Sequence, residues 1–382
     1  MVPTAFRRQR KLTAPRVMAM MIAGMCTSVQ ASIDDMFGQI AGEGIRVRAC
    51  SDRAFSKARR GVSWQALRDL NDTLLQLAAP LIDTHQWHGL RVVAADGSRL
   101  RVSTRRGADL AADHYAFALF LPGAEVTLHA RLGSHDACER QMLFESLDAT
   151  TENDLLVLDR GLIGNTIAAA ITQQKRHFCM RVDASGYACV RKFLRSGAAE
   201  TTAELKPPCR PDRISYALDN TPTPVRLIRD VTPSGTVRVL MTSLLDAQRF
   251  PAETFGALYH RRWRVEEAFK RVKHRLHLEA VSGLTYLALQ QDFAAKVLAD
   301  NLHTLLASAH QGATDTPEPV NSRPNRTAAF GALAPILVGC LLNIRKCLKK
   351  LKTALDLIIN TRCRIQTGRS YRRPPRVKPH AY

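Results

Sequence analysis

Residues 259–278 read YHRRWRVEEAFKRVKHRLHL and are the most informative stretch of this 382-residue chain. At about 100° per residue, a helix gathers four of its polar residues within about 60° on one stripe: Tyr259, Arg262, Glu266 and Lys273. An apolar stripe lies beside it, formed by Val265, Phe269, Val272 and Leu276. The stretch therefore predicts a helix that packs one flank into a core and presents one carboxylate among cations along the adjoining edge.

This polar stripe has two interpretations. In an ordinary solvated face, Glu266 pairs with Arg262 or Lys270 at i,i+4 spacing. In a phosphodiester site, the carboxylate holds a metal ion, the cations hold the scissile strand, and Tyr259 packs on a sugar or donates to a phosphate. A metal site of this kind needs more than one carboxylate, because Mg²⁺ takes oxygen ligands and a pair of ions about 3.5–4 Å apart clamps the attacking and leaving oxygens.

Two aspartates supply the further carboxylates. Asp96 ends the apolar run RVVAAD, and Asp159 ends the run DLLVLD; each run predicts a strand. Either aspartate alone is equally explained as a turn residue, since Asp-Gly and Asp-Arg-Gly are ordinary turn sequences. Acids at the ends of neighbouring strands that face a helix carrying Glu266 predict a three-carboxylate cluster.

The pattern of apolar residues divides the chain into regions. Residues 1–90 predict helices, for example from leucines at 67, 70, 74 and 77. From residue 90 onward, strand-like runs alternate with helical stretches, which indicates an α/β core. In this scheme Leu90–Ala95 is a strand, Asp96–Ser98 a tight turn and Leu100–Ser103 a second strand.

Residues 183–245 differ from the core in having β-type runs separated by prolines. The runs are Gly186–Phe193, Ile214–Leu218, Val225–Val231 and Thr236–Thr242. Closely spaced strands with proline turns predict an all-β insertion. Residues 252–309 predict helices again, 311–326 a linker, and Phe330–Ile359 a final helix followed by a disordered tail rich in Arg and Pro.

The charge balance is strongly basic and unevenly distributed. Lys and Arg number 55 against 34 Asp and Glu, a formal net charge of +21 with a pI near 10.1. The excess lies in residues 1–60, 259–278 and 341–382, and the last segment holds 12 Lys and Arg against one acid. A charge of this size suggests a polyanion as partner, most often nucleic acid, and says nothing about fold.

The nine cysteines form no C-x-x-C pair and no metal-ligand spacing with histidine. This scatter is typical of reduced thiols in a cytoplasmic protein, so no zinc site or disulfide framework is expected. No apolar run reaches the roughly 18 residues that a membrane span needs. Basic residues before Val17–Met25 imitate a signal peptide, but the run is short and an amphipathic helix is the favoured interpretation.

The signature residues resemble a known family. Tyr259, Arg262, Glu266 and Lys273 fit Y-x2-R-x3-E-x6-K, the signature of insertion sequence 4 family transposases of the DDE class. VVAADGSRLRV looks like the family's first-aspartate motif and LLVLDRGLIG like its second, and the segment LLDAQRFPAETFGALYHRRWRVEEAFKRVKHRLHLE is similar throughout. The resemblance covers roughly residues 45 to 310.

The resemblance implies roles for these residues. Asp96, Asp159 and Glu266 would be catalytic ligands of two Mg²⁺ ions, for which Mn²⁺ substitutes. Tyr259, Arg262 and Lys273 would engage DNA near the transposon end, with the two cations on phosphates. The implied activity is a DNA transposase: metal-assisted hydrolysis frees a 3′-OH at the end of the insertion sequence, and that hydroxyl attacks target DNA. Synapsis of two ends implies a homodimer on DNA.

The resemblance also implies an α/β RNase H-like catalytic core interrupted by the all-β insertion. The expected domains are a helical N-terminal DNA-binding domain at 1–88, the first part of the core at 89–182, the insertion at 183–248, the remainder of the core at 249–310, and a linker, helix and basic tail at 311–382. Two other functions stay open: an RNase H-like nuclease or decayed transposase that no longer transposes, and a basic DNA-binding protein whose carboxylates are structural.

Overall fold

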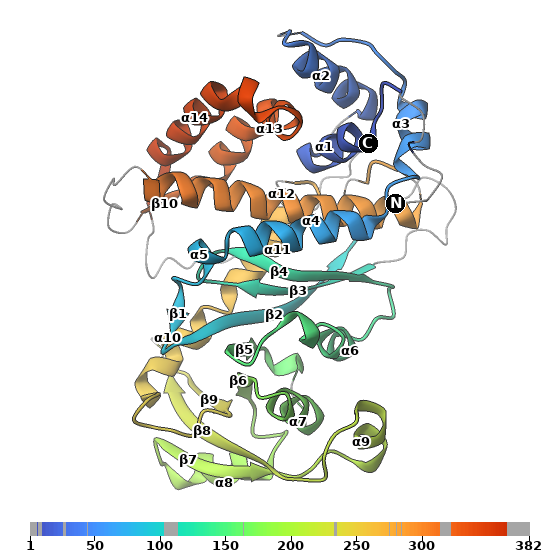
Figure 1. Ribbon diagram of the computed structural model, residues 1–382. Helices are drawn as coiled ribbons and strands as arrows, with labels where there is room; N and C mark the ends of the chain where they lie inside the picture. The colour runs from blue at the N-terminus through green and yellow to red at the C-terminus, as the bar shows by residue number, and fades with distance from the viewer. Residues whose placement is uncertain are drawn as a thin grey trace.

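The computed structural model describes residues 6, 10–25, 28–43, 45–102, 114–162, 164–232, 235–274, 276–279, 281–283, 285–313 and 322–364. Within these residues a large mixed sheet is preceded and followed by helical segments (Figure 1). The predicted α/β class is therefore confirmed. The expected linker at 311–326 lies partly outside the described residues, and the Arg- and Pro-rich tail lies entirely outside them.

Nine strands in the described part of the chain form the main sheet, in the order β4-β3-β2-β5-β6-β9-β8-β7 with β1 paired to β2. Their bounds are β1 Gln86–Trp87, β2 Leu90–Leu100, β3 His114–Leu121, β4 Val126–Gly133, β5 Asp154–Leu158, β6 His177–Val182, β7 Glu200–Leu205, β8 Thr223–Val231 and β9 Val237–Thr242. Strands β2, β5 and β6 are parallel, and the other pairings are antiparallel. Two short strands, β10 Ser322–Pro324 and β11 Arg362–Arg364, pair separately.

A buried ion pair fixes the start of the parallel pair β2–β5. Arg91 donates to both carboxylate oxygens of Asp154, at 2.6 and 2.7 Å, and the two residues are also register partners. Asp154 is fully buried, so its charge is stabilised by this forked contact. The pair sets the register in which the two strands run on toward the predicted aspartates.

Helices cover both faces of the sheet. On one face lie α10 Phe255–His260 and α11 Trp263–His274, and Val265 and Phe269 of α11 pack against Ala94 and Phe120. The other face is covered by further helices whose apolar residues join the cluster around Val93 and Phe117: α6 Glu139–Phe144, α7 Asn165–Gln173 and α8 Ala188–Ser196. Short 3₁₀ turns connect some of these elements: η2 Leu147–Ala149, η3 Arg160–Leu162 and η4 Ala252–Thr254. The sheet is thus a buried middle layer.

The terminal helical segments meet on the long helix α12, Tyr286–Ala313 (Figure 1). The N-terminal helices are α1 Ala14–Ala23, α2 Val29–Ala41, α3 Asp52–Arg59, α4 Trp64–Leu77 and α5 Ala79–Ile82. The C-terminal helices are α13 Arg326–Leu342 and α14 Ile344–Asn360. Arg59 at the end of α3 is buried and donates to Asp292 of α12 at 2.8 Å. This ion pair ties the N-terminal helices to α12.

The prediction of an all-β insertion at 183–248 is wrong. Gly186–Phe193 and Ile214–Leu218 were expected as strands, but the structure forms α8 and α9 (Arg210–Tyr216) there. Val190 and Phe193 are spaced for one helical face and are both buried, and Pro211 lies in the first turn of α9, where its fixed φ suits a helix. Strands β7, β8 and β9 extend the main sheet beyond β6.

Three predicted boundaries also differ from the structure. Residues 90–100 form the single strand β2, in which Gly97 pairs with Phe117, and not a strand, turn and strand. The expected continuous helix at 259–278 is two helices, α10 and α11. The expected final helix is likewise two, because Asn343 caps α14 by accepting from the Lys346 N–H.

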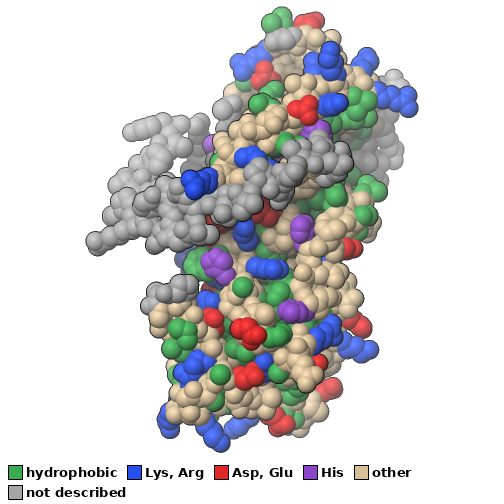
Figure 2. Space-filling view, turned by 90° about the vertical axis from the view of Figure 1, so that its left-hand side faces the viewer, with side chains coloured by type: hydrophobic (Ala, Val, Ile, Leu, Met, Phe, Trp, Pro, Cys, Tyr) green, Lys and Arg blue, Asp and Glu red, His purple; other side chains and the backbone are tan. Residues whose placement is uncertain are grey.

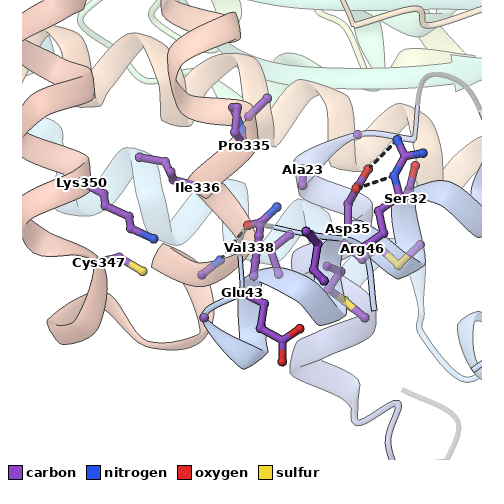
Figure 3. A pocket seen from close by; sticks show the side chains of 18 residues that line it. Ala23, Ser32, Asp35, Glu43, Arg46, Pro335, Ile336, Val338, Cys347 and Lys350 are labelled. Atoms are coloured by element: carbon purple, nitrogen blue, oxygen red, sulfur yellow. Dashed lines mark hydrogen bonds and ion pairs between the residues drawn. The ribbon is translucent and has the colours of Figure 1, made fainter. Parts of the chain in front are cut away.

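A hollow of about 680 Å³ separates the N-terminal from the C-terminal helices (Figure 3). Asp35 and Arg46 form a 2.8 Å ion pair at its wall, and Lys350 of α14 lies across from them. Its lining includes none of the predicted site residues. Among the described residues, no helix is both long enough and apolar enough to cross a membrane.

Candidate active site

The two predicted aspartates occupy equivalent positions relative to the parallel strands β2 and β5. The parallel pairing of β2 with β5 ends at Ala94 and Val157, and Asp96 and Asp159 each lie two residues further along the chain. Because side chains alternate between faces, both aspartates continue the face that carries Ala94 and Val157. That face is covered by α10 and α11, so the aspartates point toward the helix pair that bears Glu266.

A tight turn joins α10 to α11 and positions Arg262. The Arg262 N–H donates to the Tyr259 carbonyl at 3.1 Å, and the Val265 N–H donates to the Arg262 carbonyl at 3.1 Å. These i→i−3 bonds are 3₁₀ geometry, which turns the chain more sharply than an α-helix. The turn leaves Arg262 directed at the sheet, one helical turn before Glu266.

Arg262 links Glu266 to Asp96. Its Nη2 donates to Glu266 Oε1 at 2.9 Å, and its Nη1 lies 3.9 Å from Asp96 Oδ1. The Arg262 side chain is only 5% exposed. Its Nε and Nη1 are buried without a hydrogen-bond acceptor among the described residues. The structure thus brings two of the three predicted carboxylates to a single guanidinium, whose hydrogen-bonding capacity is not filled.

The electrostatics of Asp96 reflect this crowding. Burial raises the pKa of its carboxyl to about 7, and the carboxylates of Glu139, Glu266 and Asp159 add to the rise, while Arg262 opposes it. For Arg262, burial alone would lower the pKa, but nearby Tyr259 and the surrounding acids raise it overall. The charge of Asp159 contributes to the pKa shifts of both Asp96 and Arg262, so Asp159 lies near them. One of its carboxylate oxygens, Oδ1, accepts a hydrogen bond from the Arg160 N–H at 2.6 Å.

Tyr259 and Lys273 are less open to DNA than the sequence suggested. Tyr259 is buried in an apolar cluster, with the guanidinium groups of Arg238 and Arg262 over its ring at 5.0 and 5.9 Å. Burial raises the pKa of its hydroxyl to about 12. Lys273 donates to the Arg99 carbonyl at the end of β2. Contact of Tyr259, Arg262 and Lys273 with DNA stays a prediction.

Glu139 is a fourth acid at this site that sequence reasoning missed. It opens α6, and its carboxylate lies against the backbone of Gly97, next to Asp96: a Cβ built on Gly97 would lie 2.7 Å from Glu139 Oε1. Burial raises its pKa, and the Asp159 charge adds to the rise. An acid in the first turn of a helix is ordinary, because it complements the helix dipole, and so the sequence contained no signal that singled Glu139 out.

The donor set fits a hard divalent cation, although the carboxylates do not yet enclose one. Among the described residues, no three His, Cys, Asp or Glu side chains lie close enough together to hold a metal ion. Four acids nevertheless influence one another around a single buried guanidinium: Asp96, Glu139, Asp159 and Glu266. Carboxylate oxygens are the ligands that Mg²⁺ prefers, and a buried excess of negative charge favours a cation.

Comparisons with known proteins agree with this geometry. Residues 87–302 match a family model described as a transposase DDE domain. The chain is 26% identical over 239 residues to the transposase InsG for insertion sequence element IS4 of Escherichia coli (strain K12). That alignment covers 58% of this chain and 53% of the relative, so the chain spans about half the length of the curated relative it matches.

A solved structure is similar at a greater distance. It is a cryo-EM structure of a piggyBac transposase synaptic complex with hairpin DNA, with a TM-score of 0.46 and 11% identity over 92% of this chain and 79% of that chain. A likeness at this level transfers no function.

Proposed function

The chain belongs to the transposase DDE domain family, and from that premise we propose that it cleaves the ends of an insertion sequence and joins them to target DNA. The observation that carries this proposal is the meeting of Asp96 and Glu266 at Arg262. Asp96 and Asp159 each lie two residues beyond Ala94 and Val157, the last pair of the parallel register between β2 and β5. Asp96 and Asp159, which follow the paired parts of two parallel strands, and Glu266, on a helix that covers those strands, are the three acids that the sequence signature predicts as metal ligands.

The three carboxylates would hold Mg²⁺ or Mn²⁺, as a pair of ions. When bound, these ions lower the pKa of an attacking water or hydroxyl and neutralise charge on the phosphoryl group. Asp96, Asp159 and Glu266 would supply oxygen ligands to these ions and fix where the ions bind. Arg262, held between Asp96 and Glu266, would balance their charge and fix their orientation before DNA enters.

The proposed reaction has two displacements at phosphorus. Water attacks the phosphodiester at the element's end, the P–O3′ bond breaks, and the departing 3′ oxygen takes up a proton. That 3′-OH then attacks a target phosphodiester, forming a new P–O3′ bond and releasing a target 3′-OH. Hydrolysis exchanges a P–O3′ bond for a P–O bond to the water oxygen, and strand transfer exchanges one P–O3′ bond for another, so neither step requires a co-reactant other than water.

The sheet order supports an RNase H-like core as the finer description of the fold. Strands β4-β3-β2 form an antiparallel meander, and β5 and β6 follow β2 in parallel. The first aspartate lies on the central strand β2, and the second follows β5. The boundaries of the domains, and DNA binding by the helical domain at 1–88, are part of the same proposal.

Helix α14 is the surface best suited to hold DNA. Five cations are exposed on its first nine residues: Arg345, Lys346, Lys349, Lys350 and Lys352. None of the five makes an ion pair within the part of the chain that the structure describes. Cations near a helix N-terminus are opposed by the helix dipole, so phosphates offer them a more favourable partner than solvent.

Figure 2 shows the side of the molecule that lies to the left in Figure 1, the side on which α14 is drawn, and Lys and Arg side chains with some Asp and Glu are visible at its upper end. A homodimer that holds two element ends, acting on chromosomal DNA in the bacterial cytoplasm, completes the proposed assembly.

A strand-transfer assay tests the function. A DNA fragment carrying both ends of the encoding element is incubated with the chain, a target plasmid and Mg²⁺ or Mn²⁺. Glu266→Gln should abolish both cleavage and joining, while DNA binding stays within about twofold. Glu267→Gln, at the exposed neighbouring position, is the matched control and should remain active.

The outcomes separate the competing functions. Cleavage without joining identifies a nuclease. DNA binding without either reaction, in wild type and both variants, identifies a DNA-binding protein or a decayed copy. Cleavage that survives Glu266→Gln overturns the proposed mechanism.

A further inference from the structure

The carboxylate of Glu139 lies close to the backbone just after both predicted aspartates, at Gly97 and at Gly161. A Cβ built on Gly97 would lie 2.7 Å from Glu139 Oε1, and one built on Gly161 would lie 3.9 Å from Oε2. The two oxygens therefore face the backbone beside Asp96 on one side and beside Asp159 on the other.

Glycine at position 97 is what permits this approach. Any other residue would place its Cβ 2.5 Å from Tyr115 Cε1 as well as against Glu139, so both neighbours would have to move. Gly97 has no left-handed backbone angle that would require glycine for a turn, and it sits inside β2. The Glu139 carboxylate thus occupies the space that a side chain at position 97 would fill. Glycine weakens a strand, so the close approach of Glu139 is a reason for glycine at this position.

Helix stability does not explain this placement. An acid in the first turn helps a helix from an exposed position, through the helix dipole. Glu139 is instead partly buried beside Asp96 and Asp159, where like charges repel and burial disfavours the charged form. Arg262 opposes the rise in the pKa of both Asp96 and Glu139, but both stay raised, so its charge does not offset their burial and repulsion. The buried Nε and Nη1 of Arg262 have no acceptor among the described residues.

We propose that Glu139 is a functional fourth acid of the site: a positioning residue that packs its carboxylate against Gly97 of the Asp96-bearing strand and contributes its charge to binding the divalent cation. This inference rests on the proposed function, because the cation is the one assigned to Asp96, Asp159 and Glu266. Residues that support metal ligands in this way commonly change metal affinity about 10- to 100-fold when they are replaced.

Glu139→Gln in the full-length chain is the decisive variant. The amide keeps the size of the side chain, and so its packing against Gly97, but it removes the charge. The Mn²⁺ dissociation constant is measured by electron paramagnetic resonance, with and without a DNA duplex, and should rise at least about tenfold. The melting temperature without metal should stay level or rise, because like-charge repulsion is relieved.

A merely structural role gives the opposite pattern, with a lower melting temperature and unchanged Mn²⁺ affinity, and that result overturns the inference.

Glu145→Gln is the matched control, because Glu145 follows the last residue of the same helix and pairs with Arg131 outside the site. Asp96→Asn distinguishes the two levels of proposal. If Asp96→Asn weakens Mn²⁺ binding and Glu139→Gln does not, the role of Glu139 falls and the proposed function stands. If wild type binds no Mn²⁺, both fall.

Discussion

Arg262 donates a 2.9 Å hydrogen bond to Glu266, the residue one helical turn later, from a side chain that is almost entirely buried. The same guanidinium lies 3.9 Å from Asp96 on the sheet below. This places a cation between two carboxylates that the proposed reaction needs for metal binding. Contact of Arg262 with a DNA phosphate would require the guanidinium to exchange these acids for the phosphate.

Replacing Arg262 with methionine should destabilise the chain and make its stability depend on divalent metal. Removing one partner of a buried pair leaves uncompensated charge, with an expected cost of about 3 kcal/mol. Added Mn²⁺ should recover part of that loss, because a bound cation replaces the guanidinium charge. Thermal unfolding with EDTA and with Mn²⁺ measures both effects. Arg264→Met, on the same helix but half-exposed, is the control. An equal Mn²⁺ effect in wild type and Arg262→Met would contradict the prediction.

The raised pKa of Asp96 predicts a stability that falls as pH increases. A carboxyl whose pKa is about 7 in the fold and near 4 in the unfolded chain holds its proton more tightly when folded. Its contribution is therefore fully present below pH 4 and is lost as the pH rises through 7, by at most about 4 kcal/mol. Unfolding in EDTA between pH 5 and 8.5 should show this loss, and Asp96→Asn should flatten it. The affinity for Mg²⁺ or Mn²⁺ should instead increase with pH, because below pH 7 protons compete with the metal ion for the Asp96 carboxylate.

Neutralising the exposed face of α14 should lower DNA affinity and its salt dependence. Each lost phosphate contact reduces the slope of log K against log salt by about 0.9. The triple change Lys346→Ala, Lys349→Ala and Lys350→Ala should thus reduce the slope by up to about 3. Fluorescence anisotropy with a duplex at several salt concentrations measures it. The control triple removes exposed cations near the other end of the molecule: Lys192, Arg195 and Lys206. Equal effects of the two triples would show that only net charge matters.

Local patterns in the sequence were enough to select the candidate site residues, but not the structure that surrounds them. Asp96, Asp159 and Glu266 follow from local patterns, an apolar run that ends in an acid and a helical stripe. The break at Arg262 does not, because the 3₁₀ turn depends on burial of its guanidinium against Asp96 on another element. Glu139 was missed for the same reason: its position in the chain is that of a helix-start acid, and only tertiary packing turns it inward.

Residues 183–248 show how local periodicity can mislead. Tyr187, Cys189 and Val190 lie close enough to imitate a strand, but the pair Val190 and Phe193 is buried on one side of α8. Prolines before Tyr216 suggested turns between strands, whereas Pro211 begins α9. The predicted strands at Val225–Val231 and Thr236–Thr242 do form, as β8 and β9, but β9 pairs with β6 of the main sheet, and such long-range pairing is not encoded in the spacing of single residues.

The ion pair between Arg59 and Asp292 should be a major contributor to stability. Both side chains are 5% exposed, and Arg59 also donates to Gln291 and to the Ala288 carbonyl. Arg59→Met should reduce the free energy of unfolding by about 3–5 kcal/mol, because Asp292 is left buried without its cation. Urea unfolding provides the measurement. Arg68→Met, at an exposed position with a 3.7 Å contact to Asp69, should change it by less than about 1 kcal/mol.

Gly97→Ala should damage the site with only a modest loss of stability. The new Cβ would lie 2.5 Å from Tyr115 Cε1 and 2.7 Å from Glu139 Oε1, so the Glu139 carboxylate must withdraw from the Asp96 strand. The expected costs are about 1–3 kcal/mol in unfolding and a rise in the Mn²⁺ dissociation constant similar to that of Glu139→Gln. If Gly97 and Glu139 act through one contact, the double variant should bind Mn²⁺ no more weakly than the weaker single variant. Additive losses would mean that the two residues affect the cation by separate routes.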